Sequence, residues 1–267
     1  MDVNPLVRLC FIEVAEPNMH DPSGDVRRVR EAIEFEWGLT DLAIDLTVVE
    51  ELQTILRLGK WKVTVAVYVG HDIIAIWPGF KDRVLGLAVD VGSTTIAAHL
   101  CDLASGDVLA SSGMMNPQIR FGEDLMSRVS YVMMHPDGVV QMTDVVRSAI
   151  RTLIDEVCLE AQVDALDILD STFVGNPVMH HLLLGLSPVE LGVDPFALAT
   201  DESVRLQASE LDLSFHPGAR SYTLPCIAGH VGADAAAMSR SIPLEKALDD
   251  TLIALYQNGE RIRPEQG

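Results

Sequence analysis

The chain has 267 residues, a length that corresponds to one large domain or two modest ones. Hydrophobic residues make up 48% and charged residues 22%, which excludes a disordered polymer and allows a substantial core. The net charge of −20 disfavours nucleic-acid binding, because phosphate contacts require clustered cations. The sequence contains no apolar run of the roughly 18 residues that would span a membrane. Its start lacks the pattern of a signal peptide, so we expect a cytoplasmic protein without a membrane partner.

The first 80 residues predict a small α+β domain that carries no recognisable chemistry. Apolar residues at helical spacing follow Asp25, and Gly38 provides a stop signal for that helix. The segment around Gly70 joins two apolar runs and predicts a hairpin. The expected elements are a strand over 7–14, helices over 25–37 and 48–58, and hairpin strands over 62–69 and 73–77.

Residues 84–240 predict a second, larger α/β domain, followed by a short helix and tail over 241–267. The run at 84–91 is almost continuously apolar, as in a strand buried on both faces. Short turns after it predict a three-stranded antiparallel meander. The expected elements are strands over 84–91, 96–103, 108–112, 171–175 and 222–228, and helices over 122–135, 143–160, 178–184, 233–240 and 244–256.

Cysteines and histidines give no metal signature. The cysteines form no C-x-x-C pair, and we expect buried thiols without an iron–sulfur cluster. They are Cys10, Cys101, Cys158 and Cys226, at intervals of 91, 57 and 68 positions. His180 and His181 are adjacent in a predicted helix and point about 100° apart, which favours a bracing role over a shared metal.

The strongest local signal is the hexapeptide from Asp90 to Thr95. An acidic residue ends a buried strand, and Gly92 permits a tight turn. Ser93, Thr94 and Thr95 then add hydroxyl groups and backbone N–H donors. Such a turn can wrap the terminal phosphates of a nucleotide, while a carboxylate can hold Mg²⁺ through water. The alternative is a polar strand-to-strand turn whose hydroxyls bond locally.

The element order β-β-β-α-β-α-β-α, with that turn between the first two strands, is typical of the ribonuclease-H-like half-domain of the actin and Hsp70 ATPases. Four sequence segments resemble one particular family of these ATPases. They read GLAVDVGSTT at 86–95, NPQIRFGED at 116–124, VGNPVMHHLLLG at 174–185 and AGHVGAD at 228–234. In this order they resemble the reductive activators of corrinoid proteins, ATP-dependent proteins that return cob(II)alamin to cob(I)alamin in methyltransferase systems. The resemblance implies a mixed-sheet α/β half-domain preceded by the family's small middle domain.

The resemblance also implies site residues. Asp90 and the turn from Gly92 to Thr95 correspond to the first phosphate segment, with Asp90 near Mg²⁺. Asp234 begins a connecting helix and is either a second carboxylate at the cleft or a charge favoured by the helix dipole. Asn116 and Asn176, each before a proline, are either turn formers or, for Asn176, a cleft residue that orients a ligand.

We find no counterpart in this sequence for three segments of the family. The family has an N-terminal [2Fe–2S] domain and, after the connecting helix, a second phosphate segment and an adenosine-binding segment. Residues 252–259 read LIALYQNG, without an Asp-x-Gly. We therefore expect a truncated or split activator that binds ATP and Mg²⁺ only weakly, with a dissociation constant above about 1 mM.

Two functions stay open at this point. One is ATP-linked reductive activation of a corrinoid protein, with a separate second ATPase lobe, a ferredoxin-type reductant or self-association completing the system. The other is a docking module for a corrinoid protein or nucleotide, without catalysis. A small-molecule kinase is disfavoured, because residues 1–80 contain no substrate motif.

Overall fold

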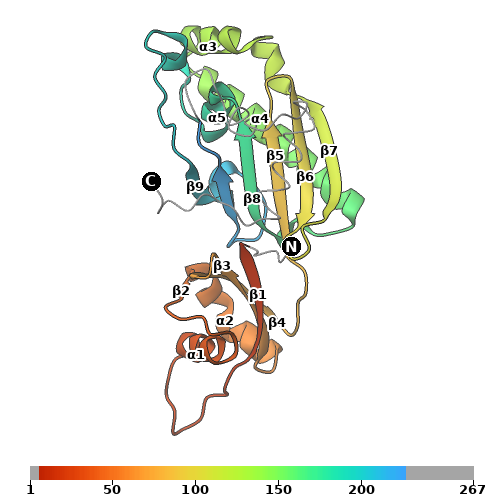
Figure 1. Cartoon of the computed structure of the whole chain (residues 1–267), viewed down its shortest axis with the longest axis vertical. Helices are drawn as coiled ribbons and strands as arrows, with labels where there is room; N and C mark the ends of the chain where they lie inside the picture. The colour runs from red at the N-terminus through yellow and green to blue at the C-terminus, as the bar shows by residue number, and fades with distance from the viewer. Residues whose placement is uncertain (1–5, 227–267) are drawn as a thin grey trace.

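The computed structural model describes residues 6–226, which form two sheets with their helices (Figure 1). A four-stranded sheet has the order β1-β3-β4-β2, and a six-stranded sheet has the order β7-β6-β5-β8-β10-β9. We call residues 6–80 the N-terminal unit and residues 84–226 the large unit. No helix within 6–226 is long and apolar enough to cross a membrane.

The N-terminal unit has the expected helices and hairpin, with one additional strand. Its elements are β1 (Val7–Glu13), α1 (Asp25–Trp37), β2 (Ala43–Ile44), α2 (Leu46–Leu58), β3 (Lys62–Tyr68) and β4 (Asp72–Pro78). The two-residue β2 pairs in parallel with β4 and is too short to leave a periodic signal in the sequence. Helix α2 begins two residues earlier than expected, with Asp45 at the N-cap position, where its backbone carbonyl accepts from Val48 N and Val49 N.

Strand β1 forms one edge of the small sheet, and α1 covers part of that edge. The backbone carbonyl of Phe11 accepts a hydrogen bond from Trp37 Nε1 at 3.1 Å. The backbone N–H of Glu13 donates to Glu36 Oε1 at 2.9 Å. The last turn of α1 therefore satisfies backbone groups that β1 turns away from its neighbour β3.

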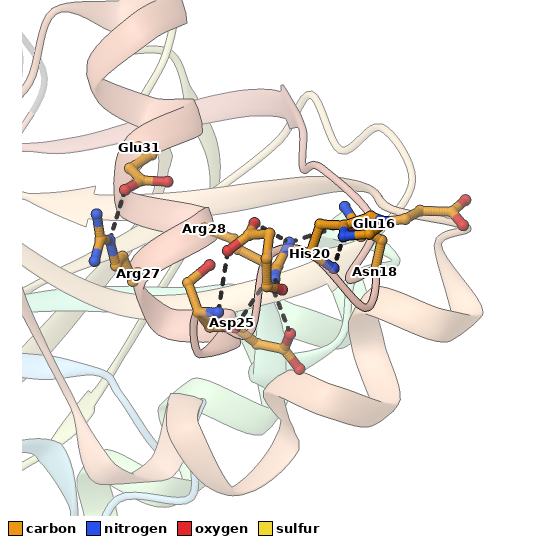
Figure 2. A network of polar contacts seen from close by, with 9 residues as sticks. Glu16, Asn18, His20, Asp25, Arg27, Arg28 and Glu31 are labelled. Atoms are coloured by element: carbon orange, nitrogen blue, oxygen red, sulfur yellow. Dashed lines mark hydrogen bonds and ion pairs between the residues drawn. The ribbon is translucent and has the colours of Figure 1, made fainter.

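A buried arginine anchors the loop between β1 and α1, as Figure 2 shows. Arg28 is only 2% exposed and donates to the carbonyls of Glu16, Asp21 and Ser23. Its guanidinium also pairs with the Asp21 carboxylate at 2.9 Å. Because one side chain satisfies three loop carbonyls, the loop over residues 14–24 is tied to the first turn of α1.

The large unit begins with the predicted antiparallel meander and continues with helices on one face of the sheet. Its strands are β5 (Leu85–Val91), β6 (Thr95–Asp102), β7 (Val108–Met115), β8 (Ile168–Gly175), β9 (Val204–Gln207) and β10 (Arg220–Thr223). Its α-helices are α3 (Leu125–Met134), α4 (Gly138–Ala161) and α5 (Pro177–Leu184). Four 3-10 turns are η1 (Pro117–Phe121), η2 (Ala165–Asp167), η3 (Val189–Gly192) and η4 (Ala208–Leu211).

Several boundaries differ from the sequence-based expectation. Helix α3 starts at Leu125 rather than at 122, because the Asp124 side chain caps it by accepting from Ser127 N at 2.7 Å. Strand β9 was not predicted, since it has only four residues and these are partly buried or exposed. The helices expected over 233–240 and 244–256 lie outside the described residues.

Each face of the large sheet has its own core. Alternate residues of β5, such as Leu87 and Val89, pack with α4 in one cluster. From the other face, Ala88 joins a cluster that contains Ala66 and Ile74 of the N-terminal unit. The two units are therefore joined by a continuous apolar interface rather than by a chain link alone.

Close backbone contact and one ion pair complete this junction. Ile74 lies at an irregularity of the β3–β4 ladder, and a Cβ placed on Gly218 would lie 1.8 Å from its carbonyl oxygen. Only glycine therefore allows this approach. Two residues later, Arg220 Nη2 forms an ion pair with both carboxylate oxygens of Asp45, at 2.9 and 2.7 Å.

Candidate functional site

Three strand ends meet at the edge of the large sheet that lies away from the N-terminal unit (Figure 1). Strands β5 and β8 are parallel, and Val91 is in register with Gly175. Strand β7 ends at Met115, opposite Thr95. The turn after β5, Asn116 after β7 and Asn176 after β8 are thus placed at one edge. In open α/β sheets, ligands bind outside the carboxyl ends of the strands.

The turn after β5 has a backbone that requires glycine. A Cβ on Gly92 would lie 2.4 Å from the backbone oxygen of Thr95, so another residue would force the turn open. Thr94 and Thr95 are exposed, while Asp90 and Ser93 are half-buried. The predicted phosphate segment thus lies at the surface, as a ligand-binding turn must.

Asn116 fixes that turn from beneath. It is completely buried, its backbone N–H donates to Thr94 O at 2.7 Å, and its Nδ2 donates to Gly92 O at 2.8 Å. Its Oδ1 also accepts from Gln118 N at 2.9 Å and caps η1. Asn116 therefore forms a turn, as one interpretation expected, and also binds the turn after β5.

Asn176 is the N-cap residue of α5. Its side chain accepts from Met179 N at 3.0 Å, and Pro177 follows at the first helical position. This is the turn-forming role of an asparagine before proline. A contact between Asn176 and a bound ligand stays a prediction.

The adjacent histidines brace α5, in agreement with the interpretation from sequence. His180 Nε2 lies 3.1 Å from Thr223 Oγ1 on β10. His181 Nδ1 lies 2.7 Å from the Pro177 carbonyl, and its Nε2 accepts from Ala199 N at 3.0 Å. Burial, and to a smaller extent His181, lowers the pKa of His180 to about 4, and burial also lowers the pKa of His181. Both rings are therefore neutral near pH 7.

Two buried polar residues behind the turn were missed at the sequence level. Arg128 and Gln118 are both 0% exposed, and the Arg128 guanidinium donates to Ser93 O and to Gln118 Oε1. Arg128 could have been noticed in the sequence because it lies beside Val129 on the apolar face of its helix. A charged side chain on such a face needs a buried hydrogen-bond partner.

The described residues contain no group of three or more His, Cys, Asp or Glu side chains that could hold a metal by themselves. Magnesium is commonly bound by one or two carboxylates together with substrate phosphates, so Asp90 alone would suffice only with a nucleotide. Asp234, the other predicted carboxylate, lies outside the described residues. All four cysteines are buried as expected, and burial raises the pKa of Cys10 to about 11 and that of Cys101 to about 12.

Comparison with known proteins identifies the family. The RACo middle region matches residues 85–247, and the RACo linker region matches residues 1–83, the segment that we had compared with the family's middle domain. The chain belongs to the RACo family. This assignment confirms the resemblance inferred from the four sequence blocks.

Two relatives agree with the RACo assignment. The corrinoid activation enzyme RamQ of Eubacterium limosum is 29% identical over 218 residues, which cover 81% of this chain and 37% of RamQ. A solved reductive activator for corrinoid, iron–sulfur protein is 32% identical, with a TM-score of 0.80 over 89% of this chain and 38% of that one. This structural match confirms the predicted fold class. The RACo chain described here spans somewhat more than a third of each relative.

Proposed function

We propose that this chain takes part in the ATP-dependent reductive activation of a corrinoid protein, and that it contributes the first phosphate-binding segment. The observation that carries the proposal is the convergence of three strand ends around a glycine-dependent turn, in a chain of the RACo family. The partner is then a corrinoid protein of a methyltransferase system, and the ligands are ATP and Mg²⁺.

The residues at the sheet edge suit such a ligand. Gly92 leaves the space that a Cβ would fill, and the exposed Thr94 and Thr95 present hydroxyl groups beside it. Asp90 would hold Mg²⁺ together with the phosphates, and the metal would neutralise phosphate charge during hydrolysis. The protein's own contribution is to bind and orient the phosphates through the turn.

A titration with MgATP tests nucleotide binding. We expect amide NMR shifts at residues 90–95 with a dissociation constant of about 1 mM or weaker, because one phosphate segment offers few contacts. Gly92→Ala should abolish these shifts. Gly113→Ala is the matched control, since its Cβ would meet Ile96 O at an ordinary 3.5 Å. A micromolar constant would contradict a half-site, and unshifted amides at 90–95 in 10 mM MgATP would contradict nucleotide binding there.

Reconstitution tests the activity itself. The full chain is mixed with a cob(II)alamin-loaded corrinoid protein, a low-potential reductant and MgATP, and the loss of cob(II)alamin is followed optically. A rate that depends on both ATP and the chain, and that falls with Gly92→Ala but not with Gly113→Ala, supports the proposal. Binding of the corrinoid protein without any ATP-dependent reduction would instead favour the docking module.

A further inference from the structure

Arg128 of α3 is a buried cation without a buried anion beside it. It is 0% exposed and is the largest fully buried side chain among residues 6–226. Within residues 6–226 its guanidinium makes no ion pair with a carboxylate. Burial lowers the pKa of Arg128 from its usual value, while the charge of Asp124 opposes that change. A buried charge costs several kcal/mol unless its hydrogen bonds compensate, so these bonds must have structural importance.

The hydrogen bonds of Arg128 connect three segments of the large unit. Its Nη2 donates to Ser93 O in the turn after β5, and its Nε donates to Gly122 O at 3.0 Å. Its Nη1 lies 3.4 Å from Gln118 Oε1 and 3.2 Å from Met179 Sδ on α5. Asn116 contacts the same Gln118 and Met179 atoms at 3.4 and 3.6 Å. Arg128 and Asn116 therefore form one buried cluster beneath the turn.

This cluster determines which way two peptide groups face. Asn116 Nδ2 binds the carbonyl of Gly92, and Arg128 binds the carbonyl of the next residue, Ser93. Both peptide bonds are trans. In a trans peptide the N–H points opposite to the C=O, so two carbonyls drawn inward leave the N–H groups of Ser93 and Thr94 facing outward. Neither N–H donates to a group within residues 6–226.

Two adjacent outward N–H groups form a concave site for an anion. The Arg128 charge lies behind them and is shielded from water, so it acts on the same anion through protein rather than through solvent. The chemistry of this pair of donors matches a terminal phosphate, whose oxygens accept several hydrogen bonds at once.

We propose that Arg128 is a positioning residue that, together with Asn116, aims the N–H groups of Ser93 and Thr94 at a phosphate of a nucleoside triphosphate. The identity of the ligand rests on the proposed function, whereas the orientation of the two peptide groups can be tested without any ligand.

The first experiment uses the free protein. Residual dipolar couplings of the Ser93 and Thr94 amides are measured in the wild type, in Arg128→Met and in Arg147→Met. Arg147 on α4 is the matched control, because it is also largely buried and donates to a backbone carbonyl, that of Leu183, at 3.0 Å. We expect both peptide planes to reorient in Arg128→Met and to stay unchanged in Arg147→Met.

The second experiment titrates the same three proteins with inorganic tripolyphosphate and with MgATP. We expect Arg128→Met to weaken tripolyphosphate binding at least tenfold, with a smaller loss in Arg128→Lys, which keeps the charge but not the planar fork. Arg147→Met should bind like the wild type. If Arg128→Met does not fold, Asn116→Asp tests the same cluster, because it removes the donor to Gly92 O and keeps the oxygen that accepts from Gln118 N.

The outcomes separate the two proposals. Unchanged peptide planes and unchanged phosphate affinity in Arg128→Met would overturn the positioning role, as would equal losses in Arg147→Met. A wild type that binds neither probe at residues 93 and 94 would overturn the phosphate ligand and the proposed function together. In that case the peptide planes alone would decide whether Arg128 positions the turn.

Discussion

Gly218→Ala should separate the two units without unfolding either of them. The new Cβ would lie 1.8 Å from the Ile74 carbonyl oxygen, whereas ordinary contact begins near 3.4 Å. The two backbones must therefore move apart by about 1.6 Å. That movement would also lengthen the ion pair between Arg220 and Asp45 beyond bonding distance. Overpacking of this kind typically costs about 1–3 kcal/mol, and we expect the upper end because both contacting atoms belong to backbone.

The distribution of tryptophan makes this prediction measurable. All three tryptophans, Trp37, Trp61 and Trp77, lie in the N-terminal unit, and the Trp77 ring also lies 5.5 Å from that of His216 in the large unit. Their fluorescence therefore follows the N-terminal unit and its contact with the large unit. Far-UV circular dichroism reports on both units, with the larger share of the helical signal from the large unit, which contains the 24-residue α4. In the wild type, guanidinium denaturation should give coincident transitions by both probes, because the units share a core.

In Gly218→Ala, the fluorescence transition should shift to lower guanidinium by about 0.5–1 M and separate from the dichroism transition. Gly113→Ala is the control, since its Cβ makes only an ordinary 3.5 Å contact and its midpoint should barely move. Coincident transitions in Gly218→Ala, at the midpoint of Gly113→Ala, would refute the view that close backbone contact couples the units.

Three further predictions concern polar side chains that bind the backbone or a neighbouring strand. Asn176→Ala removes the cap of α5 and should lower the free energy of unfolding by about 1 kcal/mol, while Asn176→Asp should retain it; equal stability of the two variants in denaturation would contradict the cap. Arg28→Met leaves three loop carbonyls without their donor and should accelerate proteolysis within residues 14–24; wild-type cleavage rates would show that the loop needs no anchor. Unfolded His180 takes up a proton near pH 6.5 but folded His180 only near 4, so stability should fall as pH drops through this window, by at most about 1.4 kcal/mol per unit. His180→Gln should flatten that fall, and an unchanged slope in pH-dependent denaturation would argue against a neutral buried ring.

The spacing of apolar residues predicted the helices and strands that bury a whole face. It did not predict the strands that are only two to four residues long. Strand β5 could be recognised because six of its seven residues are apolar or small, with Asp90 as the exception. Strand β2 has two residues and β9 has four, and neither buries an alternating face that would distinguish it from a loop. These short strands exist because a neighbouring strand offers a free edge, which a single sequence does not reveal.

The surface residues of the candidate site could be predicted from the sequence, whereas the buried residues beneath them could not. Gly92 and the hydroxyl residues after it were recognisable, since a tight turn after a buried strand needs that composition. The contribution of Arg128 depends on the docking of α3 against a turn 35 positions earlier in the chain. Local spacing cannot predict such a contact, although a charge on an apolar helix face indicates that one is needed.

The covered edge of β1 has a consequence for behaviour at high concentration. An open sheet edge is a template on which a strand from another molecule can add. Along β1, two of the groups that such a strand would need, the Phe11 carbonyl and the Glu13 N–H, are already bound by Trp37 and Glu36. The last turn of α1 thus hinders edge-to-edge aggregation along this strand.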